Sequence, residues 1–225
     1  MRVYIKGLNA CVMRNQKLAQ YRSFLEANGH LITDAPPKAE AIILWTCAFR
    51  ADHRDASIET IKKTLNNYNA VVIAAGCLPA IAGAYLPKNK KLILAYWNNE
   101  IKYFDKIFKT KKSLSEFSDV FVEKRLCKDA AEYRQETGRD ATFHDQFIKL
   151  VVSEGCNFKC AYCSERLAFP PYKSVPPEEL ERNCRKIMKE TDVFDVILLA
   201  DSLGQYGCDI GTDLFELIKR LSMID

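Results

Sequence analysis

Three cysteines in the second half of the chain share one short segment, and their spacing indicates metal chemistry. Cys156, Cys160 and Cys163 form a Cys-x3-Cys-x2-Cys pattern directly after an apolar run, residues 147–152. Such a run followed by small and polar residues is typical of a strand that leads into a loop. A cubane iron–sulfur cluster normally has four protein ligands. Three closely spaced cysteines without an obvious fourth nearby therefore indicate a cluster in which one iron has no protein ligand. Such an open iron can bind a small molecule.

Two other interpretations of this segment are a zinc site and three buried structural thiols. Structural zinc prefers four closed ligands, commonly from paired Cys-x2-Cys knuckles. The sequence holds one Cys-x2-Cys pair, Cys160 with Cys163, and no second pair to complete such a site. The pattern therefore favours an iron–sulfur cluster over zinc.

The spacing and its setting in Glu154-Gly155-Cys156-Asn157 resemble the signature of the radical S-adenosylmethionine enzymes. The resemblance implies that the open iron binds S-adenosylmethionine, and that an electron from the cluster cleaves it to a 5′-deoxyadenosyl radical. It also implies that Tyr162, just before the third cysteine, packs beside the adenine of that cofactor. An electron donor of the flavodoxin or ferredoxin type is implied as a partner.

Composition sets the class of protein. The chain has 225 residues, enough for one large or two small domains, and 48% of them are hydrophobic. No apolar run reaches the length of a membrane span, and the N-terminus lacks the apolar segment of a signal peptide. The nine cysteines are an odd number, which favours ligands over disulfides. We therefore expect a soluble, cytoplasmic protein without a membrane partner. The net charge of +4 permits a nucleic-acid or ribosomal partner without arguing for one.

The N-terminal part, residues 1–108, alternates apolar runs with amphipathic segments. Such alternation predicts an open, mostly parallel α/β sheet with flanking helices. The expected strands are residues 2–7, 31–32, 41–45, 70–75 and 92–95, and the expected helices are residues 16–28, 52–68 and 100–108.

Cys11, Cys47 and Cys77 each follow the end of a predicted strand. In a parallel sheet the carboxyl ends of the strands share one edge, where α/β proteins build their sites. Cysteines far apart in the sequence can meet there and hold a second metal centre. The alternative is that each is a small buried hydrophobic residue, since free cysteine is often buried.

Several segments resemble the methylthiotransferases, radical enzymes in which three cysteines hold a second cluster. The segments are Trp45–Phe49, Gly76–Pro79 and Tyr206–Gly211, and the first looks somewhat closer to the ribosomal-protein branch than to the transfer-RNA branch. Ala10 and Trp45 stand where the family usually has Gly and Asn. The resemblance covers nearly the whole chain.

This family resemblance implies two [4Fe-4S] clusters, the second held by Cys11, Cys47 and Cys77. It also implies a reaction that converts a C–H bond to C–S–CH3 on a tRNA nucleoside or a protein side chain, the latter in a ribosomal protein. One S-adenosylmethionine would supply the radical and another the methyl group.

The rest of the chain is predicted as a linker and the beginning of a barrel. Residues 109–145 are polar and mixed in charge, which is typical of a linker, with a short helix near 128–136. Residues 146–225 predict a βαβα unit, the first two βα units of a partial radical S-adenosylmethionine barrel, so we expect a truncated domain. Its expected strands are residues 147–152 and 193–199, and its expected helices are residues 177–190 and 213–221.

Asp201 and Ser202 follow the second of these strands, at the end where barrels place their chemistry. They are candidate contacts for the amino group of S-adenosylmethionine. The other cysteines and the histidines lack ligand spacing, and we interpret them as structural, surface or capping residues: Cys127, Cys184, Cys208, His30, His53 and His144. Two alternative functions stay open, a different radical C–H functionalisation of a peptide or small molecule, and a truncated, non-catalytic iron–sulfur module.

Overall fold

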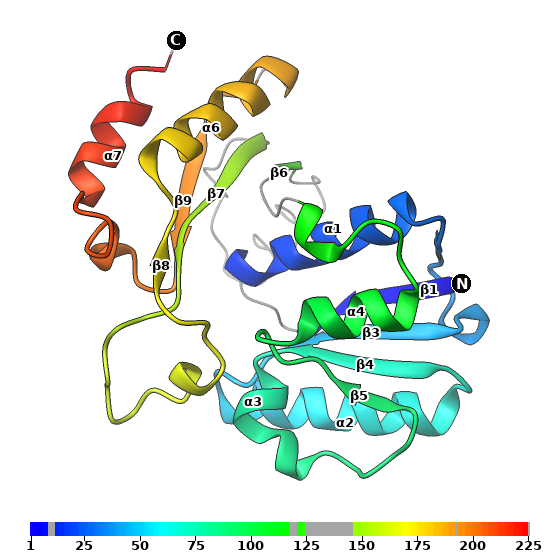
Figure 1. The fold of residues 1–225 in the computed structure, drawn as a ribbon. Coiled ribbons are helices and arrows are strands. Elements are labelled where there is room, and N and C mark those ends of the chain that lie inside the picture. Colours follow the sequence, from blue (N-terminus) through cyan, green and yellow to red (C-terminus); the bar gives the residue numbers. More distant parts are fainter. Residues whose placement is uncertain (9–11, 118–120, 125–145, 192, 225) are drawn as a thin grey trace, which may run out of the picture. The chain divides into compact units, whose positions relative to one another are not determined.

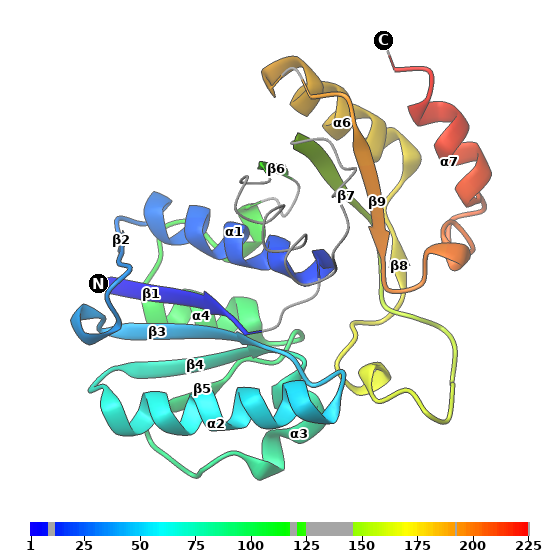
Figure 2. The same ribbon diagram turned by 180° about the vertical axis from the view of Figure 1, so that it is seen from behind.

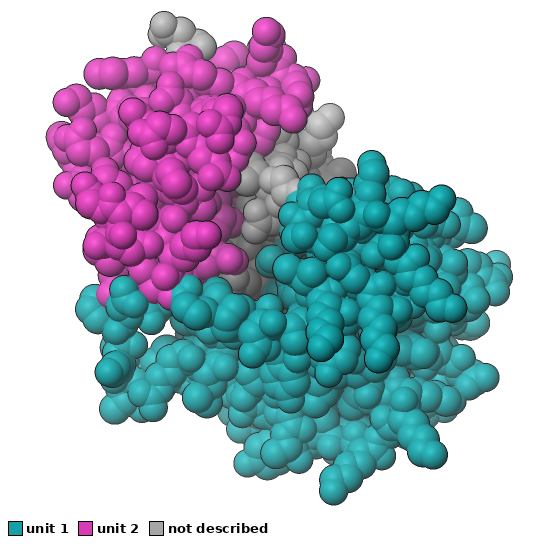
Figure 3. Space-filling view, viewed as in Figure 1, with its two compact units in different colours: residues 1–119, 156–171 teal, residues 120–155, 172–225 magenta. Residues whose placement is uncertain are grey.

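The computed structural model describes residues 1–8, 12–117, 121–124, 146–191 and 193–224 (Figure 1, and from behind Figure 2). Its contacts divide the chain into two compact units (Figure 3). The first comprises residues 1–119 and 156–171, and the second residues 120–155 and 172–225. The cysteine loop is thus grouped with the N-terminal unit, although we predicted it as part of a domain that begins at residue 146.

The first unit is built on a parallel sheet of five strands, in the order β2-β1-β3-β4-β5. This confirms the predicted open α/β sheet. The chain passes from β1 outward to β2 and returns to β3 on the other side of β1, so a topological switch point lies between β1 and β3. Ligands bind beyond the carboxyl ends of the strands at such a point. The strands are β1 (Arg2–Gly7), β2 (Leu31–Ile32), β3 (Ala41–Thr46), β4 (Val71–Gly76) and β5 (Leu92–Leu94).

Helices cover both faces of this sheet, as Figure 1 shows. Ile43 and Trp45 of β3 pack with α1 (Val12–Ala27) and α4 (Glu100–Phe108). Ile42 and Leu44 pack on the opposite face with α2 (Ala51–Asn67) and α3 (Leu78–Ala82). All six residues of β3 are buried, which explains why this strand reads as a continuous apolar run rather than an alternating one.

The second unit is organised around β7 (Gln146–Glu154), which pairs in parallel with β9 (Val196–Ala200). The crossover between these two strands includes α6 (Pro177–Thr191), and α7 (Leu214–Leu221) follows β9 (Figure 2). The structure thus contains the predicted βαβα unit. Each parallel strand is followed by a helix, as in the first two units of a barrel.

Two short antiparallel strands also pair with β7. They are β6 (Phe121–Lys124) and β8 (Lys173–Ser174). The segment that we predicted as a linker, residues 109–145, therefore contains a strand of the second sheet. Strands of four and two residues carry too little periodicity to be read from sequence. The helix expected near residues 128–136 lies outside the described residues.

Alternate residues of β7 face different environments, as the pleat of a strand requires. Ile148, Leu150 and Val152 pack against α6 and α7 through Leu180, Cys184 and Leu217, all buried. Lys149, Val151 and Ser153 point to the other face and are buried too. Cys184 is a core residue, in agreement with its predicted structural role. Among the described residues, no helix is both long enough and apolar enough to cross a membrane.

Candidate functional site

Cys47 and Cys77 lie at neighbouring carboxyl ends of the first sheet. The register of β3 and β4 pairs Thr46 with Gly76, the residues directly before the two cysteines. The backbone N–H of Cys77 donates a hydrogen bond to the carbonyl oxygen of Thr46 at 3.2 Å. Neither cysteine is in a disulfide, and Cys47 is buried while Cys77 is partly exposed. The structure therefore brings together two of the three cysteines predicted to share this edge.

The third cysteine of the set, Cys11, lies outside the described residues. The strand before it ends at the same edge, because Gly7 pairs with Trp45 in the register of β1 and β3. The N–H of Leu8 also donates to the carbonyl oxygen of Trp45 at 2.8 Å. The chain thus leaves β1 beside the end of β3, three residues before Cys11.

Gly76 lets the chain pass from β4 to Cys77. Its φ angle is +91°, in the left-handed region that favours glycine. A Cβ atom at this position would lie 2.4 Å from the carbonyl oxygen of Thr46. A side chain here would therefore push β4 away from β3 at the point where Cys47 and Cys77 begin.

Helix α2 fixes Cys47 through two side chains on one face. The hydroxyl of Ser57 donates to the carbonyl oxygen of Cys47 at 3.0 Å and accepts from the N–H of Cys47 at 3.3 Å. One helical turn earlier, Nδ1 of His53 lies 3.7 Å from Sγ of Cys47. We predicted a surface or capping role for His53. In the structure its imidazole instead contacts the sulfur of Cys47, a cysteine of the candidate site. Its four-residue spacing from Ser57 places the two side chains on the same face of α2, but the sequence does not show that this face meets Cys47.

The cysteine loop follows β7 directly. Gly155 makes the turn with a φ angle of +78°. Cys156, Cys160 and Cys163 are partly exposed and form no disulfide. The N–H of Cys163 donates to the carbonyl oxygen of Cys160 at 3.1 Å. A short 3-10 helix, η4 (Glu165–Leu167), follows the loop and contacts α3 within the first unit. Helix α3 begins at the residue after Cys77, so the loop's continuation touches the element that Cys77 precedes.

The cysteine thiols of the candidate site suit iron–sulfur chemistry better than a site for a hard metal ion, which prefers oxygen ligands. Over the described part of the chain, no three His, Cys, Asp or Glu side chains are gathered in an arrangement that could hold a metal ion. The chemistry of the residues nevertheless fits a cluster, since no cysteine of the loop is in a disulfide and none is fully buried. Thiolates are the ligands that iron–sulfur clusters prefer.

The three predicted cofactor contacts occupy different settings. Tyr162 is 91% exposed, and a hydrogen bond to the side chain of Cys160 raises the pKa of its hydroxyl. Oδ2 of Asp201 accepts a hydrogen bond from the N–H of Gly155 at 2.7 Å. Ser202 lies at the start of η5 (Leu203–Gln205). Asp201 therefore binds the backbone that leads into the cysteine loop, while contact with S-adenosylmethionine stays a prediction for all three residues.

Strand β8 anchors the segment Tyr206–Gly211. The N–H of Ser174 donates to Oδ2 of Asp209 at 2.9 Å, and the hydroxyl of Ser174 accepts from the N–H of Gly207 at 3.0 Å. The hydroxyl of Tyr206 donates to the carbonyl oxygen of Val175 at 2.8 Å, and burial raises the pKa of Tyr206 to about 12. Cys208 in this segment is exposed. These bonds give the segment a structural role next to β7.

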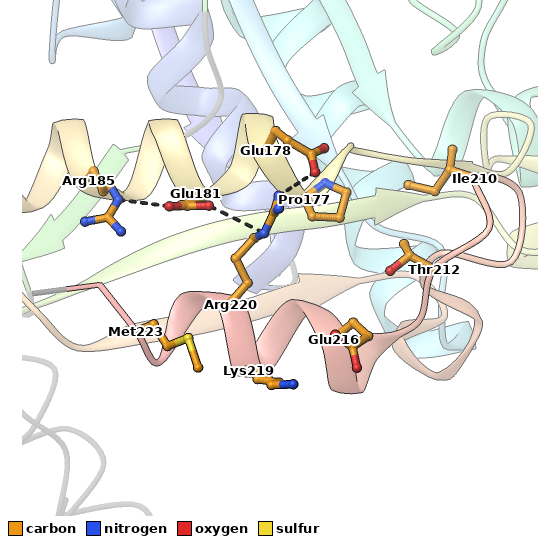
Figure 4. A pocket seen from close by; sticks show the side chains of 10 residues that line it. All are labelled: Pro177, Glu178, Glu181, Arg185, Ile210, Thr212, Glu216, Lys219, Arg220 and Met223. Carbon is orange, nitrogen blue, oxygen red and sulfur yellow. Dashed lines mark hydrogen bonds and ion pairs between the residues drawn. The ribbon is translucent and has the colours of Figure 1, made fainter.

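A hollow of about 620 Å³ lies between α6 and α7 (Figure 4). Arg220 forms ion pairs with Glu178 and Glu181, and Arg185 pairs with Glu181 as well. None of the predicted site residues lines this hollow, and the charges drawn at its centre neutralise one another. Its lining residues are Pro177, Glu178, Glu181, Arg185, Ile210, Thr212, Glu216, Lys219, Arg220 and Met223.

The chain is similar in sequence to several known proteins. Residues 2–96 match the family described as uncharacterized protein family UPF0004. Over 204 residues the chain is 31% identical to the ribosomal protein uS12 methylthiotransferase RimO of Chlorobium limicola, which covers 87% of this chain and 43% of that protein. The chain is a relative of the methylthiotransferases. A second methylthiotransferase, the probable threonylcarbamoyladenosine tRNA enzyme of Pyrococcus horikoshii, is 25% identical over 228 residues, covering 100% of this chain and 51% of that protein.

This methylthiotransferase relative spans about half the length of the curated proteins it matches. Among solved structures, it resembles a radical S-adenosylmethionine methyltransferase, TsrM of Kitasatospora setae, with tryptophan and a cofactor analogue bound. The TM-score is 0.53 at 10% identity, covering 98% of this chain and 50% of the other. At that identity the likeness concerns the fold, and it confirms the predicted fold class.

Proposed function

We propose that this methylthiotransferase relative carries the cluster-binding part of a radical S-adenosylmethionine enzyme that converts a C–H bond to C–S–CH3. In this proposal Cys156, Cys160 and Cys163 hold one [4Fe-4S] cluster, while Cys47 and Cys77 hold a second together with Cys11. The observation that carries the proposal is the position of Cys47 and Cys77 at adjacent strand ends, in a chain that also has a Cys-x3-Cys-x2-Cys loop. A structural role would not require cysteine at both positions.

When bound, the clusters and S-adenosylmethionine supply the electron, the radical and the methylthio group. The protein's own residues hold the cysteine ligands in place. Asp201 holds the backbone of Gly155 and thereby the entry to the first triad. Ser57 fixes both backbone groups of Cys47, and the glycine at position 76 allows Cys77 to approach β3. These contacts support the proposal that both sets of cysteine ligands are held in place before a cluster binds.

The relatives' names supply the candidate substrates, ribosomal protein uS12 and a tRNA nucleoside. We infer that one of these macromolecules is the substrate, and that a flavodoxin or ferredoxin type protein supplies the electron. The cytoplasm is the proposed compartment, since no disulfide joins any of the described cysteines.

Iron and sulfide analysis of anaerobically reconstituted protein tests the two sites. The wild type is expected to hold about eight irons, two cubanes of four. The triple variant Cys156→Ala, Cys160→Ala, Cys163→Ala should hold about four, and so should Cys47→Ala with Cys77→Ala. Cys208→Ala is the matched control, because it removes an exposed cysteine outside both triads and should keep the full content. About four irons in the wild type would exclude the second cluster.

Product analysis then tests the reaction. The reduced protein is incubated with S-adenosylmethionine and either uS12 or unmodified tRNA, and both 5′-deoxyadenosine and the mass of the macromolecule are measured. Addition of sulfur together with a methyl group to one macromolecule supports the proposal. A different mass change would indicate another radical functionalisation. Two clusters without any 5′-deoxyadenosine would indicate a non-catalytic iron–sulfur module.

A further inference from the structure

His53 and Cys47 form a side-chain pair whose two members are both held in place. Nδ1 of His53 lies 3.7 Å from Sγ of Cys47. Cys47 is 8% exposed, and Ser57 binds its backbone N–H and carbonyl. His53 lies in the first turn of α2. The same helix carries Ser57, which binds the backbone of Cys47. The approach of the imidazole to the sulfur therefore follows from the docking of α2 and not from a free surface rotamer.

The other side of the imidazole faces a carboxylate. Oδ2 of Asp52 lies 4.0 Å from Nε2 of His53. The guanidinium of Arg50 binds the same carboxylate twice, at 3.1 Å through Nε and at 2.8 Å through its terminal nitrogen. Arg50 thus holds the carboxylate of Asp52 near Nε2 of the imidazole, while Nδ1 faces the sulfur of Cys47. Metal-ligand shells are commonly oriented by outer contacts of this kind.

A capping role does not account for His53. The N-cap residue of α2 is Arg50, whose side chain makes no capping hydrogen bond. The imidazole ring instead contacts the sulfur of Cys47 through Nδ1. A histidine that only covered the helix surface would not need this alignment.

We propose that His53 is a positioning residue for the N-terminal iron–sulfur site, donating a hydrogen bond from Nδ1 to the sulfur of Cys47 and so setting the reduction potential of the cluster that Cys47 binds. The inference rests on the proposed function, which makes Cys47 a ligand. Hydrogen bonds to cluster sulfurs stabilise the added negative charge of the reduced state, and so they raise the reduction potential. Burial of Cys47 strengthens the effect, because the surrounding dielectric is low.

The test measures the N-terminal cluster alone. The parent is the variant Cys156→Ala, Cys160→Ala, Cys163→Ala, in which only this cluster can form. Into it are introduced His53→Leu, which removes the donor, and His53→Asn, whose amide N–H can take the place of Nδ1–H. His30→Leu is the matched control. His30 directly precedes β2, at the amino ends of the parallel strands, whereas Cys47 follows the carboxyl end of β3. Midpoint potentials are measured at one pH by redox titration followed by electron paramagnetic resonance.

The expected result is a midpoint potential that is more negative in His53→Leu than in the parent, with His53→Asn between them and His30→Leu unchanged. Equal potentials in the parent and His53→Leu would overturn the inference and leave the proposed function standing. Loss of the cluster from both His53→Leu and His53→Asn, with unchanged unfolding of the iron-free proteins, would also overturn it, because the imidazole would then be a ligand. Absence of a cluster in the parent would refute the proposed second site itself, and the inference with it.

Discussion

The carboxylate of Asp201 accepts a 2.7 Å hydrogen bond from the backbone N–H of Gly155, which joins the end of β9 to the residue before Cys156. Gly155 has a φ angle of +78° at this point. The bond therefore holds the turn through which β7 enters the cysteine loop. Asp201 was predicted from sequence as a cofactor contact, and the structure shows that one of its oxygens supports the loop.

Removing this carboxylate is expected to loosen the first triad. Asp201→Ala should lower the free energy of unfolding by about 1.5–3 kcal/mol, because a hydrogen bond to a charged acceptor is lost. Iron content at Cys156, Cys160 and Cys163 should fall, measured in a background of Cys47→Ala with Cys77→Ala. Asp201→Asn keeps an acceptor oxygen and should retain most of the iron. Equal iron content in Asp201→Ala and its parent would show that the bond does not position the loop.

Gly76→Ala is expected to be more damaging than an ordinary glycine substitution. Besides the cost of a positive φ angle, the new Cβ would lie 2.4 Å from the carbonyl oxygen of Thr46. Gly29→Ala is the matched control, since Gly29 has a φ angle of +77° and nothing within 4 Å of its Cβ position. Urea unfolding should show a loss of about 1 kcal/mol for Gly29→Ala and at least about twice that for Gly76→Ala. Equal losses would mean that β3 and β4 accommodate the side chain.

The placement of Cys47 and Cys77 was predictable because strand ends are visible in the sequence. The apolar runs before Cys47 and Cys77 are continuous and long enough to be recognised as buried strands, and parallel pairing then aligns their ends. The pairing of Gly155 with Asp201 was not predictable, because its partners are separated by 46 residues and meet only through the register of β7 and β9. The role of His53 was missed for a related reason, since it depends on how α2 docks on the loop after β3.

Ser57→Ala is expected to release Cys47 from α2. Ser57 is fully buried and its hydroxyl serves the N–H and the carbonyl of Cys47, so its loss leaves two buried backbone groups without this partner. The free energy of unfolding should fall by about 1–3 kcal/mol. Thr60→Ala, on an exposed part of the same helix, should change it by less than about 0.5 kcal/mol. A similar small change for Ser57→Ala, by urea unfolding of the iron-free protein, would contradict the anchoring of Cys47.

Lys149 should make stability depend on pH in the alkaline range. It is 2% exposed in the middle of β7, and burial lowers the pKa of its amine from 10.5 to about 8. Between those values the unfolded chain binds more protons than the folded chain, so the free energy of unfolding rises with pH from about 8 to 10.5, by roughly 3 kcal/mol. At neutral pH the folded protein carries the full cost of the buried charge.

Lys149→Met removes this titration, so its unfolding free energy should lack the rise seen in the wild type. The comparison uses the difference between the two proteins in urea at each pH, which cancels the titration of tyrosines and cysteines that they share. Lys186→Met is the control, because the side chain of Lys186 is 71% exposed on α6 and its loss should leave the wild-type slope intact. Parallel pH profiles for the wild type and Lys149→Met would show that the amine titrates in the folded protein as it does in the unfolded chain.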